Sequence, residues 1–96
     1  VIGKISEKAM NPFEMAHGGF VYSLCDVAAG VIISREGHPG VTLNSNVHFL
    51  HPSRGTVLRA EGRIVKKGRT VSVIETEVYD DNDRLTAVGT FEIYAL

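Results

Sequence analysis

The stretch that decides the fold reads His17-Gly-Gly-Phe-Val-Tyr-Ser-Leu-Cys-Asp-Val-Ala-Ala-Gly-Val-Ile-Ile-Ser-Arg-Glu36. It is the one long segment with the composition of a helix, and Gly37 and Pro39 beyond it are the usual signals for a helix end. Because this segment is apolar on nearly every side, it predicts a helix buried in a core. Asp26 interrupts the apolar surface, and a buried carboxylate requires either a dedicated polar partner or a chemical role.

The rest of the chain predicts β-strands around this helix. Residues 41–50, 56–65, 70–79 and 85–95 alternate in the manner of strands, and residues 1–6 predict a further short strand. In the first of these segments, Val41, Leu43 and Ser45 are predicted on one face and Thr42 on the other. Short turns between the strands predict a four-strand antiparallel meander, with residues 1–6 added at one edge. The predicted fold class is α+β, with the sheet curled around one central helix.

Length and composition narrow the class of protein. A chain of 96 residues predicts a single domain over residues 1–96. Its net charge of −1 argues against nucleic acid as a partner, and we find no apolar run of about 20 residues that would span a membrane. The single Cys25 cannot form an internal disulfide, which predicts a cytoplasmic location. The chain begins with Val1 inside a predicted strand, and we expect a native N-terminal segment to precede it.

The predicted helix carries a narrow polar stripe, because Gly19, Ser23, Asp26 and Gly30 are spaced by 4, 3 and 4 residues. Free backbone N–H groups and the positive end of the helix dipole meet at its start. Gly18 would let a carbonyl oxygen approach these groups closely, so we interpret the start of the helix as a candidate oxyanion site. The simpler alternative is that Asp26 hydrogen-bonds a Ser or Thr of the sheet and has no further role.

The distance between the two candidate groups favours a dimer. Eight residues of helix place Asp26 roughly 12 Å from Gly18 along the axis, whereas reacting groups must approach within about 3.5 Å. Two antiparallel helices from two copies would bring Gly18 of one copy to Asp26 of the other. The sequence therefore predicts a homodimer with two shared active sites.

The residues resemble a known family, the PaaI-type acyl-CoA thioesterases of the hotdog-fold superfamily. The resemblance extends over nearly the whole chain and is carried by Asn11, Pro12, His17-Gly18-Gly19, Asp26, Ala28, Gly30, Gly40-Val41-Thr42, Phe49, Pro52, Gly55 and Gly68-Arg69. It implies a curved antiparallel sheet around a central helix, and dimers that pair into homotetramers. It also implies hydrolysis of an acyl-CoA thioester, with CoA as part of the substrate and no separate cofactor.

The resemblance further implies roles for single residues. Asp26 is similar to the family's catalytic carboxylate, which acts as general base or as nucleophile, and the Gly18 N–H to the group that polarises the thioester carbonyl. Asn11 and His17 are similar to side chains that line the same pocket. Thr42 takes the place of a Ser or Thr near the carboxylate. This chain departs from the family pattern at Glu14, where a glycine is common, and it lacks the usual N-terminal helix and first strand.

Three other groups of residues carry side chains that could bind a ligand or a metal or act as a nucleophile. The turn with Lys67, Gly68 and Arg69 is either a solvated hairpin turn or a binding site for the phosphates of CoA. His48 and His51 lack further ligands nearby in the sequence, so we predict no metal site. Cys25 lies off the polar stripe and is expected in the core.

Two other functions are compatible with the same residues. One is an acyl-CoA binding module without turnover, and the other is an enoyl-CoA hydratase of the same fold, in which a histidine and an acidic residue act together. The sequence does not name the acyl group.

Overall fold

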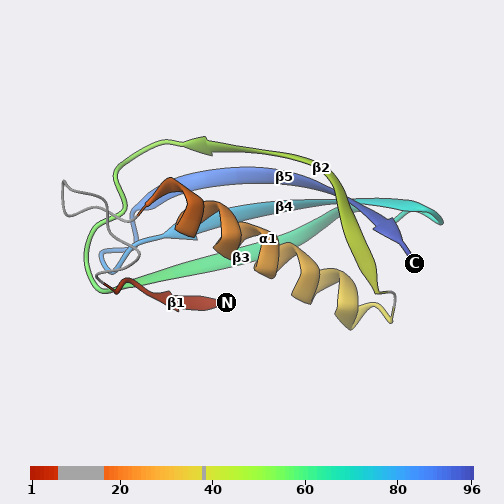
Figure 1. Ribbon diagram of the computed structural model, residues 1–96, viewed down its shortest axis with the longest axis horizontal. Helices are drawn as coiled ribbons and strands as arrows, with labels where there is room; N and C mark the ends of the chain where they lie inside the picture. The colour runs from red at the N-terminus through yellow and green to blue at the C-terminus, as the bar shows by residue number, and fades with distance from the viewer. Residues whose placement is uncertain (7–16, 38) are drawn as a thin grey trace.

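The computed structural model describes residues 1–6, 17–37 and 39–96. The described chain forms one helix and one five-stranded antiparallel sheet (Figure 1). The elements in chain order are β1 (Ile2–Lys4), α1 (Gly18–Arg35), β2 (Gly40–Phe49), β3 (Val57–Lys66), β4 (Val71–Tyr79) and β5 (Leu85–Ala95). The predicted fold class, α+β with one helix against a curled antiparallel sheet, is confirmed.

The order of the strands differs from the predicted meander. The sheet runs β1-β3-β4-β5-β2, so β3, β4 and β5 form a meander, while β2 pairs with β5 and not with β3. The predicted place of the N-terminal strand is confirmed, because β1 pairs with β3 at the edge. Turn residues show where a strand ends, but they do not determine which strands become neighbours. The helix crosses one face of the sheet and connects the two opposite edge strands, β1 and β2 (Figure 1).

The helix has the bounds that its sequence predicts. Residue His17 is the N-cap, and Glu36 is the C-cap. Gly37 follows with a φ of 83°, a left-handed conformation that glycine adopts without steric cost and that commonly ends helices. By length and composition α1 would also suit a membrane span, but one of its faces is packed against the sheet.

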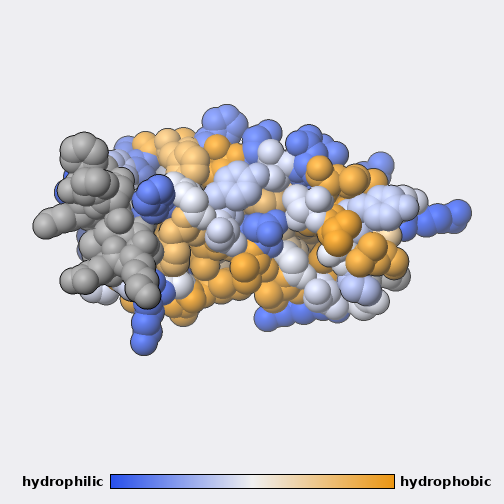
Figure 2. Space-filling view, viewed as in Figure 1, coloured by the Kyte–Doolittle hydropathy of each residue, from blue (hydrophilic) through white to orange (hydrophobic). Residues whose placement is uncertain are grey.

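The prediction that α1 is buried on all sides is wrong for the single chain. A helix on one sheet has only one covered face, which here consists of Val21, Leu24, Cys25, Ala28, Ala29 and Ile33. The stripe residues Gly19, Ser23 and Asp26 are exposed. Apolar Val27 is also 52% exposed, and Figure 2 shows apolar surface on this face of the molecule.

Small residues allow the helix to lie close to the sheet. An added Cβ at Gly62 in β3 would lie 3.1 Å from the side chain of Ile32 and 3.6 Å from the backbone oxygen of Ala28. Larger apolar side chains of the sheet complete the core on either side: Leu58, Ile74, Val78 and Phe91 are fully buried. This packing fixes the height of α1 above the sheet, and with it the position of Asp26.

The prediction of which side chains share a face of β2 is wrong, because the strand contains a β-bulge. Thr42 pairs with Ile93 and Asn44 pairs with Glu92, so Leu43 is an extra residue without an opposite partner. Such a bulge reverses the alternation of side chains beyond it. Thr42 and Ser45 were predicted on opposite faces, but both lie opposite buried residues of β5, on the side of the helix.

Candidate functional site

The candidate site lies where α1 faces β2. The Thr42 hydroxyl donates a hydrogen bond to Oδ1 of Asp26 at 2.8 Å. A charge-assisted hydrogen bond of this kind fixes the orientation of a carboxylate and leaves its second oxygen to interact with other groups. The structure thus brings together two of the predicted site residues, from the middle of the helix and the start of the strand.

A second hydrogen bond joins the same two elements one helical turn away. Tyr22 and Ser45 share it through their side-chain hydroxyls. The Tyr22 ring also contacts the ring of Phe91 edge-on, with the centroids 5.9 Å apart. Ser23, in contrast, donates to the Gly19 carbonyl oxygen of its own helix. Tyr22 and Ser45 therefore connect α1 to β2 alongside Asp26 and Thr42.

Among the residues that the structure describes, those at the start of the helix, His17, Gly18 and Gly19, are exposed. His17, the N-cap, is exposed and makes no hydrogen bond as a side-chain cap, while its carbonyl oxygen accepts the N–H groups of Phe20 and Val21. Because the first N–H groups of a helix have no partner within it, those of Gly18 and Gly19 can receive an oxyanion. Of the described side chains, Phe49 would lie nearest to an added Cβ at Gly18, at 3.7 Å.

The predicted site residues of the turn with Lys67, Gly68 and Arg69 are not brought to Asp26 within one chain. Asn11 lies outside the described residues. Lys67 and Arg69 are exposed in the β3–β4 turn, which lies at the opposite end of the molecule from the start of α1 (Figure 1). The Gly68 N–H donates to the Ser72 hydroxyl at 3.2 Å. Contacts from this turn to a phosphate would therefore come from the two cationic side chains.

Cys25 is not a candidate nucleophile, although it is the neighbour of Asp26. Its side chain is completely buried, and burial raises the pKa of the thiol above its ordinary value. A buried neutral thiol is a poor nucleophile, because the thiolate is the reactive form. The prediction that this residue belongs to the core is confirmed.

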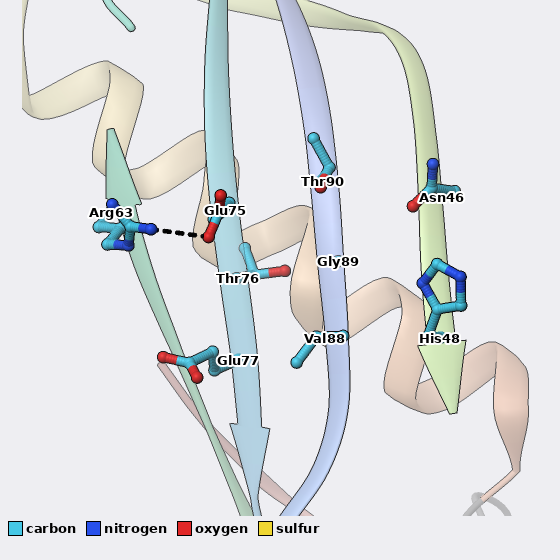
Figure 3. Close-up of a pocket in the computed structure, with 9 residues that line it drawn as sticks. All are labelled: Asn46, His48, Arg63, Glu75, Thr76, Glu77, Val88, Gly89 and Thr90. Atoms are coloured by element: carbon cyan, nitrogen blue, oxygen red, sulfur yellow. Dashed lines mark hydrogen bonds and ion pairs between the residues drawn. The ribbon is translucent and has the colours of Figure 1, made fainter. Parts of the chain in front are cut away.

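A separate hollow of about 350 Å³ lies on the other face of the sheet (Figure 3). It is lined by Asn46, His48, Arg63, Glu75, Thr76, Glu77, Val88, Gly89 and Thr90. Two of these residues, Arg63 and Glu75, form an ion pair at 2.8 Å on one side of the hollow. In the described part of the chain, no three His, Cys, Asp or Glu side chains are placed to hold a metal ion. The sheet separates this hollow from Asp26.

Sequence reasoning did not predict the contact between Tyr22 and Ser45 beside the site. The bulge at Leu43 brings Ser45 to the same side as Thr42, and after its first residue, Gly40, the strand contains no glycine or proline that would indicate a bulge. The spacing of four residues between Tyr22 and Asp26 was an available signal, because residues at this spacing share a helix face.

Comparisons with known proteins identify the family of this chain. A model of the thioesterase superfamily matches residues 13–87. A putative esterase of Saccharolobus solfataricus, SSO1253, is 29% identical over 93% of this chain and 62% of its own length. The acyl-coenzyme A thioesterase PaaI of Escherichia coli is 24% identical over 88% of this chain and 61% of its own length. The chain thus spans about three fifths of these curated relatives.

Solved structures show the same fold. The BH2602 protein of Bacillus halodurans, solved with CoA, has a TM-score of 0.95 and 36% identity over 99% of this chain and 65% of its own. A hypothetical thioesterase of Streptococcus pneumoniae, solved with coenzyme A, has a TM-score of 0.94 and 29% identity over 99% of this chain and 75% of its own. Variants of that protein with an aspartate or a threonine replaced by alanine have also been solved. The E. coli PaaI structure superposes with a TM-score of 0.94. The chain therefore belongs to the thioesterase superfamily, as a hotdog-fold protein of the PaaI type.

Proposed function

We propose that this chain hydrolyses an acyl-CoA thioester to a free acid and CoA. The observation that carries the proposal is the hydrogen bond from Thr42 to Asp26, on the central helix of a thioesterase-superfamily fold. Asp26 is exposed at this position, so an external substrate can approach it.

The relatives support this assignment. Two similar proteins have been solved with CoA, which is the leaving group of the proposed reaction. In the S. pneumoniae thioesterase, the aspartate and the threonine chosen for replacement lie 16 positions apart. Asp26 and Thr42 have the same separation. This agreement in spacing supports a joint role for the two residues.

The proposed chemistry assigns one role to each group. Asp26 acts through the oxygen that Thr42 does not occupy, either taking a proton from the attacking water or attacking the carbonyl carbon itself. The Gly18 N–H at the start of the helix donates to the carbonyl oxygen and stabilises its developing negative charge. The C–S bond then breaks, and the CoA thiolate leaves and takes up a proton. In the nucleophilic route, water hydrolyses the resulting acyl-aspartyl anhydride and regenerates Asp26.

We propose that two subunits build each site. Gly18 and Asp26 of one helix are separated by roughly 12 Å along its axis, more than one carbonyl group spans. Val27, the neighbour of Asp26 on the helix, and Leu43 of the edge strand β2 are 52% and 56% exposed, and exposed apolar side chains are typical of an association surface. In such a homodimer the partner supplies the helix start, and we propose that dimers pair into tetramers.

The direct test compares Asp26→Asn with Asp83→Asn in the release of free thiol from acyl-CoA. Asparagine keeps the shape of Asp26 but cannot act as base or nucleophile, so we expect a loss of at least about 100-fold. Asp83 is the matched control, because it lies in an exposed turn with a φ of 58° that asparagine also tolerates. Retention of more than a tenth of the activity in folded Asp26→Asn would refute the proposed role.

The same assay separates the alternative functions. A panel of phenylacetyl-, hydroxybenzoyl- and medium-chain acyl-CoAs, with enoyl-CoAs beside them, is incubated with the wild-type protein. Thiol release supports a thioesterase, and the preferred substrate defines the acyl group. Loss of enoyl absorbance without thiol release indicates a hydratase, and binding without turnover indicates a binding module.

A further inference from the structure

The two hydrogen bonds between α1 and β2 depend on the same irregularity of the strand. Residues three apart in a regular strand point to opposite faces, so Thr42 and Ser45 would normally be unable to contact the same helix. The extra residue Leu43 brings both to the helix side. On the helix, Tyr22 and Asp26 are four residues apart and also share a face. The bulge therefore allows Thr42 and Ser45 of the strand to contact Asp26 and Tyr22 of the helix.

Tyr22 is well suited to set the spacing between the two elements. Its ring packs edge-on against Phe91 of β5, a fully buried residue, and its hydroxyl is bonded to Ser45 of β2. Phe91 is also the residue opposite Ser45 in the sheet. One side chain thus contacts the helix side of two adjacent strands, next to the bulge.

The start of β2 is restrained along one edge in the single chain, by its pairing with the end of β5. Within the described residues β2 is an edge strand, paired with β5 alone, and Val41 and Leu43 are about half exposed. A bulge locally disrupts the ladder of backbone hydrogen bonds. Thr42 lies directly before this bulge and pairs with Ile93, so side-chain contacts between strand and helix act together with this pairing to set its distance from Asp26.

We propose that Tyr22 and Ser45 are positioning residues for the reaction, because their hydrogen bond holds β2 where Thr42 reaches Asp26. This inference rests on the proposed function and adds two residues to it. Neither residue is assigned contact with the reacting atoms. Their effect on catalysis passes through Thr42, and this dependence makes the inference testable.

The experiment measures kcat, KM and thermal stability for Tyr22→Phe, Ser45→Ala and the double variant. A neutral hydrogen bond favours one arrangement by up to about tenfold, but an effect that passes through Thr42 cannot exceed the loss of the Thr42 hydroxyl itself. We therefore expect kcat to fall about three- to fivefold, with KM nearly unchanged. The double variant should lose no more than either single variant, because both remove the same bond. Ser45→Thr keeps a hydroxyl and should retain activity. Ser23→Ala is the matched control, since its hydroxyl bonds within the helix.

The decisive comparison repeats Tyr22→Phe in a Thr42→Val background. If Tyr22 acts through Thr42, adding Tyr22→Phe to the Thr42→Val variant leaves its kcat unaltered. An equal loss of kcat in both backgrounds would overturn the inference, and so would a loss of stability with an unchanged kcat. If Tyr22→Phe does not fold, Ser45→Ala gives the same comparison. Absence of thiol release by the wild-type protein would instead refute the proposed function itself.

Discussion

Replacement of Thr42 by valine tests whether this residue orients the catalytic carboxylate. Valine keeps the β-branched shape, which suits a strand, and removes only the hydroxyl that donates to Asp26 at 2.8 Å. A hydrogen bond to an ionised group contributes about 1.5–3 kcal/mol where water is excluded. Because both residues are exposed in the single chain, we expect a smaller effect of about 1 kcal/mol, which corresponds to about a fivefold fall in kcat.

The assay is the initial rate of thiol release at saturating acyl-CoA. Thr42→Ser keeps the hydroxyl and should stay near wild-type activity. Thr90→Val is the matched control, because Thr90 is a threonine on the other face of the sheet that lines the separate hollow. An unchanged kcat for Thr42→Val would refute an orienting role. A loss as large as that expected for Asp26→Asn would also refute it, because the hydroxyl would then be indispensable to the chemistry.

Three further predictions concern the dimer, the CoA contacts and acid stability. Asp26→Asn and Gly18→Val should each be nearly inactive, while purified hybrid dimers of the two should recover toward half of wild-type activity; a folded, dimeric but inactive hybrid would show that each subunit has a complete site. Replacement of Lys67 and Arg69 in the β3–β4 turn by alanine should raise KM for acyl-CoA more than it changes kcat, because phosphate contacts far from the thioester stabilise the ground and transition states alike. An unchanged KM would indicate that this turn is only a solvated hairpin turn. The pKa of Asp81 lies below its ordinary value of 3.8, chiefly because the Thr56 amide donates to it. Its contribution to stability is therefore complete above the ordinary range and is lost as the pH falls through the lowered value. Asp81→Asn should lower the Tm at neutral pH, with a difference that shrinks in acid; a difference constant with pH would contradict this.

The sequence was sufficient to predict the elements and the central pair of the site. The helix begins and ends where Gly18 and Gly37 predicted, and the resemblance indicated Thr42 as the residue near Asp26. These features depend on local signals and on a motif within one helix. Asn11 lies outside the described residues, so its predicted role stays a prediction.

The sequence was not sufficient for strand order or for the alternation in β2. Pairing of β2 with β5 brings together residues as distant as Gly40 and Ala95, and a long-range preference of this kind leaves no local pattern. The bulge at Leu43 has no local sequence signal either, because a leucine between Thr42 and Asn44 is also typical of a regular strand. The contact between Tyr22 and Ser45 was not predicted for that reason. The exposure of Asp26 was not predicted, because an apolar helix is expected to be buried, but its sequence does not indicate whether its own chain or a second copy covers it.

The strand order has a consequence for how this chain folds as it leaves the ribosome. Of the strands that the structure describes, β2 has β5 as its sole partner, and β5 is the last strand to be synthesised. Non-local pairing of this kind slows folding, because the entropy of closing a long loop is lost before any contact compensates for it. Until β5 emerges, β2 and its apolar residues Val41, Leu43 and Phe49 remain without a strand to pair with. An unpaired strand edge in an incomplete chain is prone to aggregation, so truncation before β5 should yield insoluble material.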